Sequence, residues 1–152
     1  MKIVEFLQPG AVIGDLTGTS AQAVLAELSR PLAASHNIDA QRLLDTLVER
    51  EKLGSTGIGD GVAIPHGKVA GLPTIIASFG RSTPGVDFNA IDGKPTHLFF
   101  TLFAPENSAG AHLKALARIS RIFKNPAFRE SIMKAHDGAE MYRLIETEDA
   151  KY

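Results

Sequence analysis

The chain has 152 residues, 44% of them hydrophobic, and no run of 18 apolar residues, which predicts one domain over residues 1–152 and no membrane span. Sixteen Lys and Arg residues against 17 Asp and Glu residues give a formal net charge of −1, which argues against nucleic-acid binding and a basic membrane patch. Cysteine is absent, which excludes disulfides and thiolate zinc sites, and the polar N-terminus does not resemble a signal peptide. We therefore expect a cytoplasmic protein.

The first predicted elements are a strand and a helix. Residues 1–10 are expected to lead into a short strand over 11–16. A helix then begins near Thr19, because Thr19 and Gln22 have the spacing of a capping box. Its apolar positions recur at helical spacing: Ala21, Val24, Leu25, Leu28 and Leu32. Pro31 leaves the end of this helix undefined.

A second helix is predicted to begin after Asp39, a favourable N-cap residue, and to end near Gly54. Ile38 and Leu43 occupy the two positions of a hydrophobic staple at its start. Arg50 falls in its last turns, where a cation is favoured by the helix dipole.

The middle of the chain has an extended rather than a helical pattern. Apolar runs of strand length cover 62–65, 74–81 and 96–103, and the last is almost continuously hydrophobic, which predicts a strand buried on both faces. An extra short strand is expected at 86–88, and the turn signal Asp92-Gly93 favours a hairpin-like connection. These runs predict a central sheet.

The C-terminal third returns to helical patterns. Asn107 or Ser108 caps the first of three predicted helices, and Asn125 precedes a proline that opens the second. Asp137 and Glu140 have capping-box spacing for the third. Helices, then strands, then helices predict an α/β domain of two or three layers.

The most unusual stretch is 54–68, in which four glycines between positions 54 and 61 lead to His66. Such a stretch leaves backbone N–H groups open to an anion, while Pro65 fixes its own φ and Gly67 removes a side chain beside the imidazole. A structural histidine at a strand end is the alternative. The flanking residues favour a nucleophile that meets a bulky anionic group.

Two further residues suit the same chemistry. His112 lies in the first turn of a predicted helix, where it is either a packing residue or a donor to a phosphoryl oxygen attached to His66. Arg50 is either a solvated cation near a helix end or a guanidinium that holds a phosphoryl dianion. The sequence alone leaves both alternatives open.

Other sites have little support. His36, His97 and His136 are expected to be structural or exposed, and a zinc site of His66, His97 and His112 has no supporting ligand spacing. The glycine stretch lacks the Gly-Lys-Ser/Thr ending of a nucleotide-binding loop. We expect neither a cofactor nor a metal.

The run from Glu51 through residues 58–67 (IGDGVAIPHG) resembles the phosphorylation-site signature of the mannitol/fructose-type enzyme IIA components of the bacterial phosphotransferase system. The resemblance covers nearly the whole chain. Four further segments resemble the nitrogen-regulatory branch in particular: 50–59, 88–95, 98–105 and 112–116. Phe103 and Ala104 depart from the aliphatic residues that are usual in relatives.

The resemblance implies a mixed central sheet flanked by helices on both sides, the mannitol-type fold. It also implies that His66 accepts a phosphoryl group from a phosphohistidine carrier protein, itself supplied by enzyme I of the phosphoenolpyruvate relay. Arg50 and His112 would line the site, and no metal or nucleotide would take part. The implied protein is a phosphotransferase component, a phosphocarrier rather than a stand-alone turnover enzyme.

The resemblance favours a nitrogen-regulatory phosphocarrier that controls regulatory target proteins according to its phosphorylation state. One alternative is a sugar-specific permease component that passes the phosphoryl group to a IIB domain. Another is an interaction module in which His66 is never phosphorylated.

Overall fold

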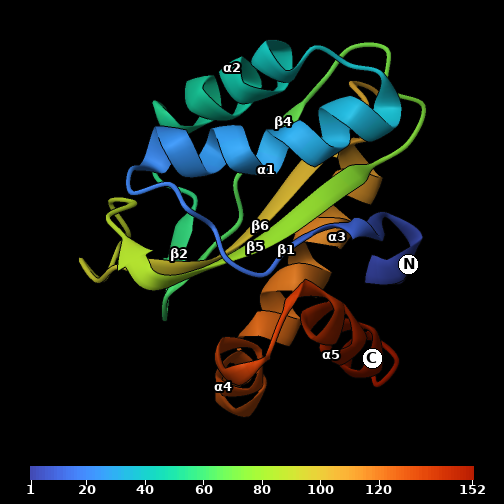
Figure 1. The fold of residues 1–152 in the computed structure, drawn as a ribbon. Coiled ribbons are helices and arrows are strands. Elements are labelled where there is room, and N and C mark those ends of the chain that lie inside the picture. The colour runs from blue at the N-terminus through green and yellow to red at the C-terminus, as the bar shows by residue number, and fades with distance from the viewer.

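The computed structural model describes residues 1–152 as a six-stranded sheet between two layers of helices (Figure 1). The N-terminal half contains the 3-10 turn η1 (Ile3–Glu5), strand β1 (Leu7–Ile13), helices α1 (Ala21–His36) and α2 (Ala40–Glu51), and strands β2 (Gly57–Gly59), β3 (Val62–Ala63) and β4 (His66–Lys68). The remainder contains strands β5 (Ile76–Val86) and β6 (Thr96–Ala104), and helices α3 (Ala109–Phe123), α4 (Pro126–Lys134) and α5 (Gly138–Asp149).

Strand β6 organises the sheet, whose order is β1-β5-β6-β3-β2 with β4 also paired to β6. It runs antiparallel to β5 and parallel to both β3 and β4. Val62 lies opposite Leu98 and His66 lies opposite Leu102, so β3 and β4 follow one line along the same edge of β6. Pro65 interrupts that line because it has no N–H to donate, although its carbonyl accepts a hydrogen bond from the backbone of Leu102.

Helices α1 and α2 cover one face of the sheet, and α3, α4 and α5 cover the other (Figure 1). On the second face, the buried rings of Phe79 and Phe100 pack against Phe123, with centroids 5.4 Å and 5.9 Å from it. Toward the first face, Ser78 donates a hydrogen bond of 2.8 Å to the carbonyl of Leu28 in α1. Alternation of side chains along the strands accounts for the two different faces.

Arg81 connects the sheet to α4 from inside the molecule. Its guanidinium is buried and donates hydrogen bonds to the carbonyls of Gly14, Ile132 and Ala135. The carboxylate of Asp15 lies 3.6 Å away. Carbonyl oxygens at the end of a helix favour a cation, so Arg81 fixes the C-terminal end of α4 against β5.

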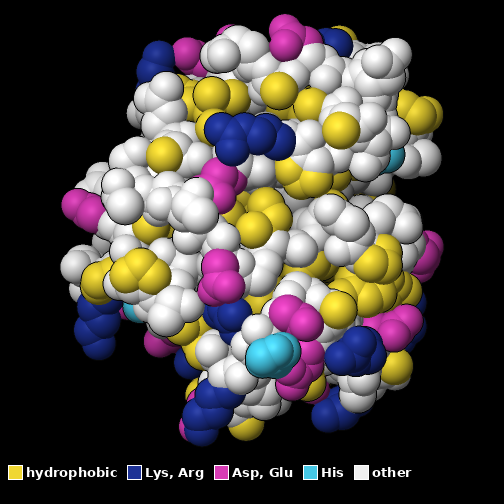
Figure 2. All heavy atoms as spheres, viewed as in Figure 1, with side chains coloured by type: hydrophobic (Ala, Val, Ile, Leu, Met, Phe, Trp, Pro, Cys, Tyr) yellow, Lys and Arg dark blue, Asp and Glu magenta, His cyan; other side chains and the backbone are white.

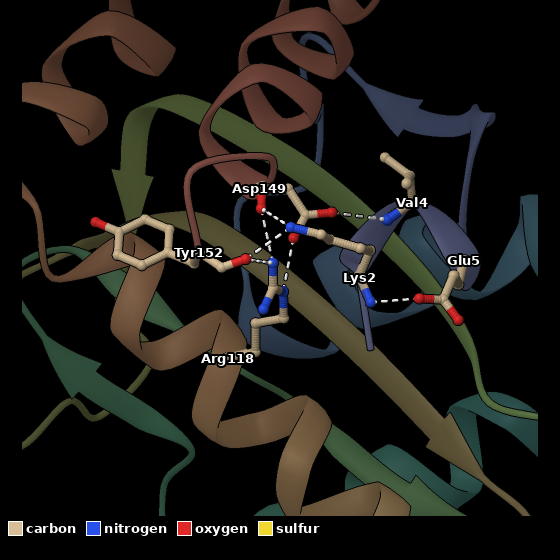
Figure 3. Close-up of polar contacts among 6 residues, drawn as sticks. All are labelled: Lys2, Val4, Glu5, Arg118, Asp149 and Tyr152. Carbon is tan, nitrogen blue, oxygen red and sulfur yellow. Dashed lines mark hydrogen bonds and ion pairs between the residues drawn. The ribbon is translucent and has the colours of Figure 1, made fainter.

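A second polar network joins the two ends of the chain (Figure 3). Asp149 is buried, and its carboxylate accepts hydrogen bonds from Arg118 Nε at 2.7 Å and from the backbone N–H of Val4 at 3.2 Å. Lys2 Nζ donates to the backbone carbonyls of Asp149 and Tyr152, at 3.0 Å and 2.6 Å. The network thereby fixes the first turn of the chain and its last residues against α3.

The predicted N-terminal strand was misplaced. Residues 1–10 are not a mere lead-in, because they form η1 and the first part of β1, and the strand ends at Ile13 rather than at residue 16. Pro9 and Gly10 obscure the strand pattern, but β1 is an edge strand, where proline is tolerated, and its register with β5 shifts between Leu7 and Val12.

The predicted helices need smaller corrections. Helix α1 is capped by Ser20 rather than Thr19, since Ser20 Oγ accepts a hydrogen bond from the N–H of Ala23. It continues through Pro31 and ends where Asn37 adopts the left-handed conformation. The caps predicted at Asp39, Ser108, Asn125 and Asp137 are the N-cap positions of α2, α3, α4 and α5, although the Ser108 side chain makes no capping bond.

Two predictions for the sheet were also incomplete. No separate strand forms at 86–88, because β5 extends as far as Val86. The glycine stretch contributes strand β2, which pairs with β3 through a turn at Gly59, Asp60 and Gly61, all with positive φ. Glycine reaches such φ values readily, which explains its density there.

The surface seen from the same side carries hydrophobic side chains scattered among charged groups of both signs (Figure 2). This mixture agrees with the net charge of −1. None of the helices combines the length and the hydrophobicity that a bilayer crossing requires.

Candidate active site

The position of α2 on the sheet depends on Gly67, which follows His66 in β4. A Cβ atom at Gly67 would lie 2.5 Å from Cγ2 of Thr46, so only glycine allows the helix to pack this closely. Arg50 lies four residues after Thr46, and therefore one turn further along the same side of α2. Burial is the main cause of the lowered pKa of His66, and the positive charge of Arg50 lowers that pKa further.

The half-buried ring of His66 is held by one hydrogen bond. Its Nδ1 lies 2.7 Å from the backbone carbonyl of Ile64. A carbonyl oxygen only accepts, so this contact is a hydrogen bond when Nδ1 carries the proton. In that tautomer Nε2 keeps its lone pair, the electron pair through which a neutral imidazole can act as a nucleophile.

His112 reaches the same place by way of β6. That strand pairs with β4 and then continues, after a short loop, into the first turn of α3, which carries His112. The two imidazoles lie edge to face, with centroids 5.4 Å apart and an interplanar angle of 71°. His112 is buried, and its Nε2 has no hydrogen-bond partner within the protein.

The surroundings favour the neutral form of both rings. Burial is the largest influence and lowers the pKa of His66 and of His112 below their ordinary value of 6.5. The neighbouring Arg50 lowers the pKa of His66 further, whereas the carbonyl of Ile64 and the carboxylate of Glu51 raise it. A neutral His66 has the lone pair that an attack on phosphorus requires.

Several N–H groups of the glycine stretch already have partners within the protein, which leaves fewer of them for an anion than the sequence suggested. The N–H of Gly57 donates to Ser55 Oγ, and the N–H of Asp60 donates to the carboxylate of Asp92. A Cβ at Gly57 would lie only 3.1 Å from the Cβ of Ala90. The glycines of this stretch therefore serve the shape of the turn and close packing.

Glu51 and Thr56 hold this stretch in place, and the sequence had given neither residue a role. The carboxylate of Glu51 accepts hydrogen bonds from the N–H and the hydroxyl of Thr56, which is buried. Next to it, Arg50 donates to the carbonyl of Gly54 at 2.8 Å. The sequence marked Glu51 only as the start of the run that resembles the phosphorylation-site signature and as an acidic residue at the unfavourable end of a helix.

The remaining histidines lie elsewhere. Nδ1 of His97 contacts the carbonyl of Ser82 at 2.9 Å, and His36 and His136 are exposed. His97 is five residues from Leu102 along β6, which places it about 17 Å along the strand from the pairing partner of His66. The imidazoles of His66 and His112 thus share one site, Arg50 lies on the helix that packs against β4, and no group of three His, Asp or Glu side chains is arranged to hold a metal.

A neutral imidazole at an accessible edge, next to a second imidazole and a guanidinium, is suited to a domain that carries a phosphoryl group. Residues 5–148 match the family described as "Phosphoenolpyruvate-dependent sugar phosphotransferase system, EIIA 2". The chain belongs to this EIIA family, and it is a phosphotransfer component of the phosphotransferase system.

Individual relatives agree with this assignment. The nitrogen regulatory protein of Bradyrhizobium diazoefficiens is 36% identical over 145 residues, which cover 95% of each chain. The fructose-specific EIIABC component of Bacillus subtilis is 33% identical over 98% of this chain, but over only 24% of its own length. The structure of the nitrogen regulatory protein IIA-Ntr of Neisseria meningitidis has a TM-score of 0.88 at 36% identity, covering 94% of this chain and 98% of that chain. The predicted family and the predicted α/β fold are confirmed.

Proposed function

We propose that this chain is a regulatory phosphocarrier of the nitrogen branch of the phosphotransferase system. His66 accepts a phosphoryl group from the phosphohistidine of a small carrier protein, which enzyme I supplies from phosphoenolpyruvate. The phosphorylation state of His66 then controls binding to regulatory target proteins. The observation that carries the proposal is the 2.7 Å contact between Nδ1 of His66 and the Ile64 carbonyl, which leaves Nε2 free to attack.

The transfer needs no cofactor and no net proton movement. The lone pair on Nε2 of His66 forms a new N–P bond while the N–P bond of the donor breaks, and the bonding electrons return to the donor nitrogen. A donor ring protonated on its other nitrogen leaves as neutral imidazole. The positive charge then lies on the ring of His66, where Nδ1–H donates to the carbonyl of Ile64.

Arg50 and His112 stabilise the transferred group. The guanidinium of Arg50 supplies positive charge and directed N–H groups for the phosphoryl oxygens. Nε2 of His112 is a buried polar atom without a partner in the protein, and as an N–H it donates to a phosphoryl oxygen on His66. Transfer between two imidazoles depends mainly on such alignment and charge stabilisation.

The second candidate is a sugar-permease component that passes the phosphoryl group to a IIB domain. It is favoured by the 33% identity to a fructose-specific component. The nitrogen-regulatory function has the stronger support, because full-length relatives at 36% identity carry that name. Both candidates share the first step, the phosphorylation of His66.

The first test is phosphorylation in a reconstituted relay. The protein is incubated with phosphoenolpyruvate, enzyme I and the small carrier, and intact mass is measured before and after acid treatment. Wild type gains one acid-labile phosphoryl group, His66→Ala gains none, and His36→Ala, which changes an exposed histidine, behaves as wild type. An unmodified wild type, or a fully modified His66→Ala, overturns the relay.

A second experiment separates the two candidates. The purified phosphoprotein is mixed with fructose-type and mannitol-type IIB domains, and loss of the phosphoryl group is followed over time. A regulatory phosphocarrier retains the group, whereas a permease component transfers it within seconds to minutes. Transfer to a IIB domain at the rate of a dedicated IIA component would overturn the regulatory function and leave the phosphorylation of His66 intact.

A further inference from the structure

Glu51 ends α2 at an electrostatically unfavourable place for a carboxylate, because the carbonyl end of a helix repels negative charge. Its carboxylate is compensated by two hydrogen bonds from Thr56, one from the backbone N–H at 3.1 Å and one from the hydroxyl. Thr56 is only 5% exposed. The pair forms a partly buried clamp between the end of α2 and the start of β2.

The clamp changes the pairing between β2 and β3. Gly57 lies opposite Ala63, so Thr56 lies opposite Ile64 at the next position of this antiparallel ladder. The N–H of Ile64 donates to the carbonyl of Thr56 at 3.0 Å. In a regular ladder the N–H of Thr56 would donate back to the carbonyl of Ile64, since hydrogen-bonded pairs exchange both bonds.

Glu51 takes the N–H of Thr56 that would otherwise complete this exchange. The carbonyl of Ile64, which could accept from two donors, therefore meets Nδ1 of His66 at 2.7 Å without competition from the Thr56 N–H. The hydrogen bond from the Ile64 N–H to the Thr56 carbonyl remains, and it holds the peptide of Ile64 in position. A single carboxylate thus keeps a second donor away from the Ile64 carbonyl, and a carbonyl oxygen shared between two donors binds each of them more weakly.

We propose that Glu51 is a positioning residue that favours the Nδ1-protonated tautomer of His66, because it keeps the Thr56 N–H from competing for the Ile64 carbonyl. For its effect on phosphoryl transfer, this inference rests on the proposed function. Its effect on the tautomer does not, because the tautomer is a property of the unphosphorylated chain. A purely structural Glu51 would stabilise the fold without changing which ring nitrogen of His66 is protonated.

The test uses three variants of the full chain. Glu51→Ala removes the acceptor, so the Thr56 N–H is free to pair with the Ile64 carbonyl and to compete with His66. Glu51→Gln keeps an oxygen that accepts from the Thr56 N–H, and is the conservative rescue. Glu49→Ala is the matched control, because this residue lies on the same helix but is exposed and pairs with Lys52.

Nitrogen-15 NMR of the imidazole rings at neutral pH gives the direct measurement. Wild type, Glu51→Gln and Glu49→Ala show His66 protonated on Nδ1 with a lone pair on Nε2. Glu51→Ala shows a mixture in which the tautomer protonated on Nε2 is populated. If Glu51→Ala does not fold, Glu51→Gln is compared with Glu51→Asp, whose shorter side chain withdraws from the Thr56 N–H. A wild-type tautomer in every folded Glu51 variant overturns the inference.

Transfer kinetics give the second measurement. Glu51→Ala lowers the maximal rate of transfer from the phosphorylated carrier about tenfold, with an unchanged half-saturating carrier concentration, while Glu51→Gln and Glu49→Ala stay near wild type. If Glu51→Ala weakened only the binding of the carrier, Glu51 would be a docking residue and the inference would be wrong. A wild-type chain that accepts no phosphoryl group would refute the proposed function, and the NMR result would still decide the role of Glu51.

Discussion

The contact between Gly67 and Thr46 offers a sharp test of how the site is assembled. Replacing Gly67 by alanine adds a Cβ atom 2.5 Å from Cγ2 of Thr46, where two carbon atoms need about 3.5 Å. The φ of Gly67 is not positive, so alanine introduces no backbone strain of its own. The clash with α2 is therefore the main perturbation.

The size of the effect follows from this overlap. Helix α2 must withdraw by about 1 Å, or the side chain of Thr46 must give up its 2.9 Å hydrogen bond to the Arg42 carbonyl. Overpacking of this kind costs about 1–3 kcal/mol of folding free energy. A displacement of about 1 Å at Arg50 lowers the rate of phosphoryl transfer by up to about a hundredfold.

A double-mutant cycle with Thr46→Ala identifies the cause. This second change removes Cγ2, and the next nearest atoms of residue 46 already lie at 3.6 Å and 3.8 Å, which is ordinary contact. Urea denaturation and transfer kinetics are measured for both single variants and for the pair. We expect the double variant to regain most of the stability and rate that Gly67→Ala loses, a coupling of about 1–3 kcal/mol. Equal damage by Gly67→Ala in both backgrounds would refute the packing argument.

Three further predictions follow from the same structure. Arg50→Gln and His112→Gln each slow phosphorylation of His66 by about ten- to a hundredfold in the reconstituted relay, since each removes one charge-assisted contact, and neither changes the melting temperature. Wild-type kinetics in both variants would show that the two residues have only a structural role. Burial lowers the pKa of His66 and His112 below 6.5, so the unfolded chain binds more protons in acid than the folded chain does. The free energy of unfolding is therefore highest above pH 6.5 and declines below it. Urea titration at several pH values should show a smaller decline in His112→Gln than in wild type. Asp149→Ala leaves the guanidinium of Arg118 without its buried partner and lowers the free energy of unfolding by about 3 kcal/mol, as measured by chemical denaturation. A loss below about 1 kcal/mol would contradict this prediction.

Local signals in the sequence predicted most helix starts, because a cap acts over only a few residues. Asp39, Asn125 and Asp137 each accept a hydrogen bond from an N–H within three residues, and each was predicted correctly. The start of β1 was missed because its stability comes from parallel pairing with β5, some 70 residues away in the chain. At Pro9 and Gly10 this distant pairing overrides the local preference.

The same distinction applies to the site. His66 was conspicuous because its immediate neighbours are unusual, but its distance from His112 is set by the parallel pairing of β4 with β6 and by the short connection from β6 to α3. Nothing within a few residues of either histidine encodes that register. The roles of His66, His112 and Arg50 remain predictions, and their shared location is what the structure adds.

The two residues that flank His66 have separate effects, although the sequence suggested one common purpose. Pro65 has no N–H to donate to β6, so the pairing along this edge of β6 is interrupted between β3 and β4, directly before the histidine. Gly67 has no effect on that ladder, but it lets α2 approach closely and so brings Arg50 and Glu51 to the site. A change at Gly67 should therefore act through α2, whereas a change at Glu51 should act through Thr56 and Ile64. The two variants are distinguishable because Glu51→Ala alters the tautomer of His66 with α2 in place, whereas Gly67→Ala displaces α2.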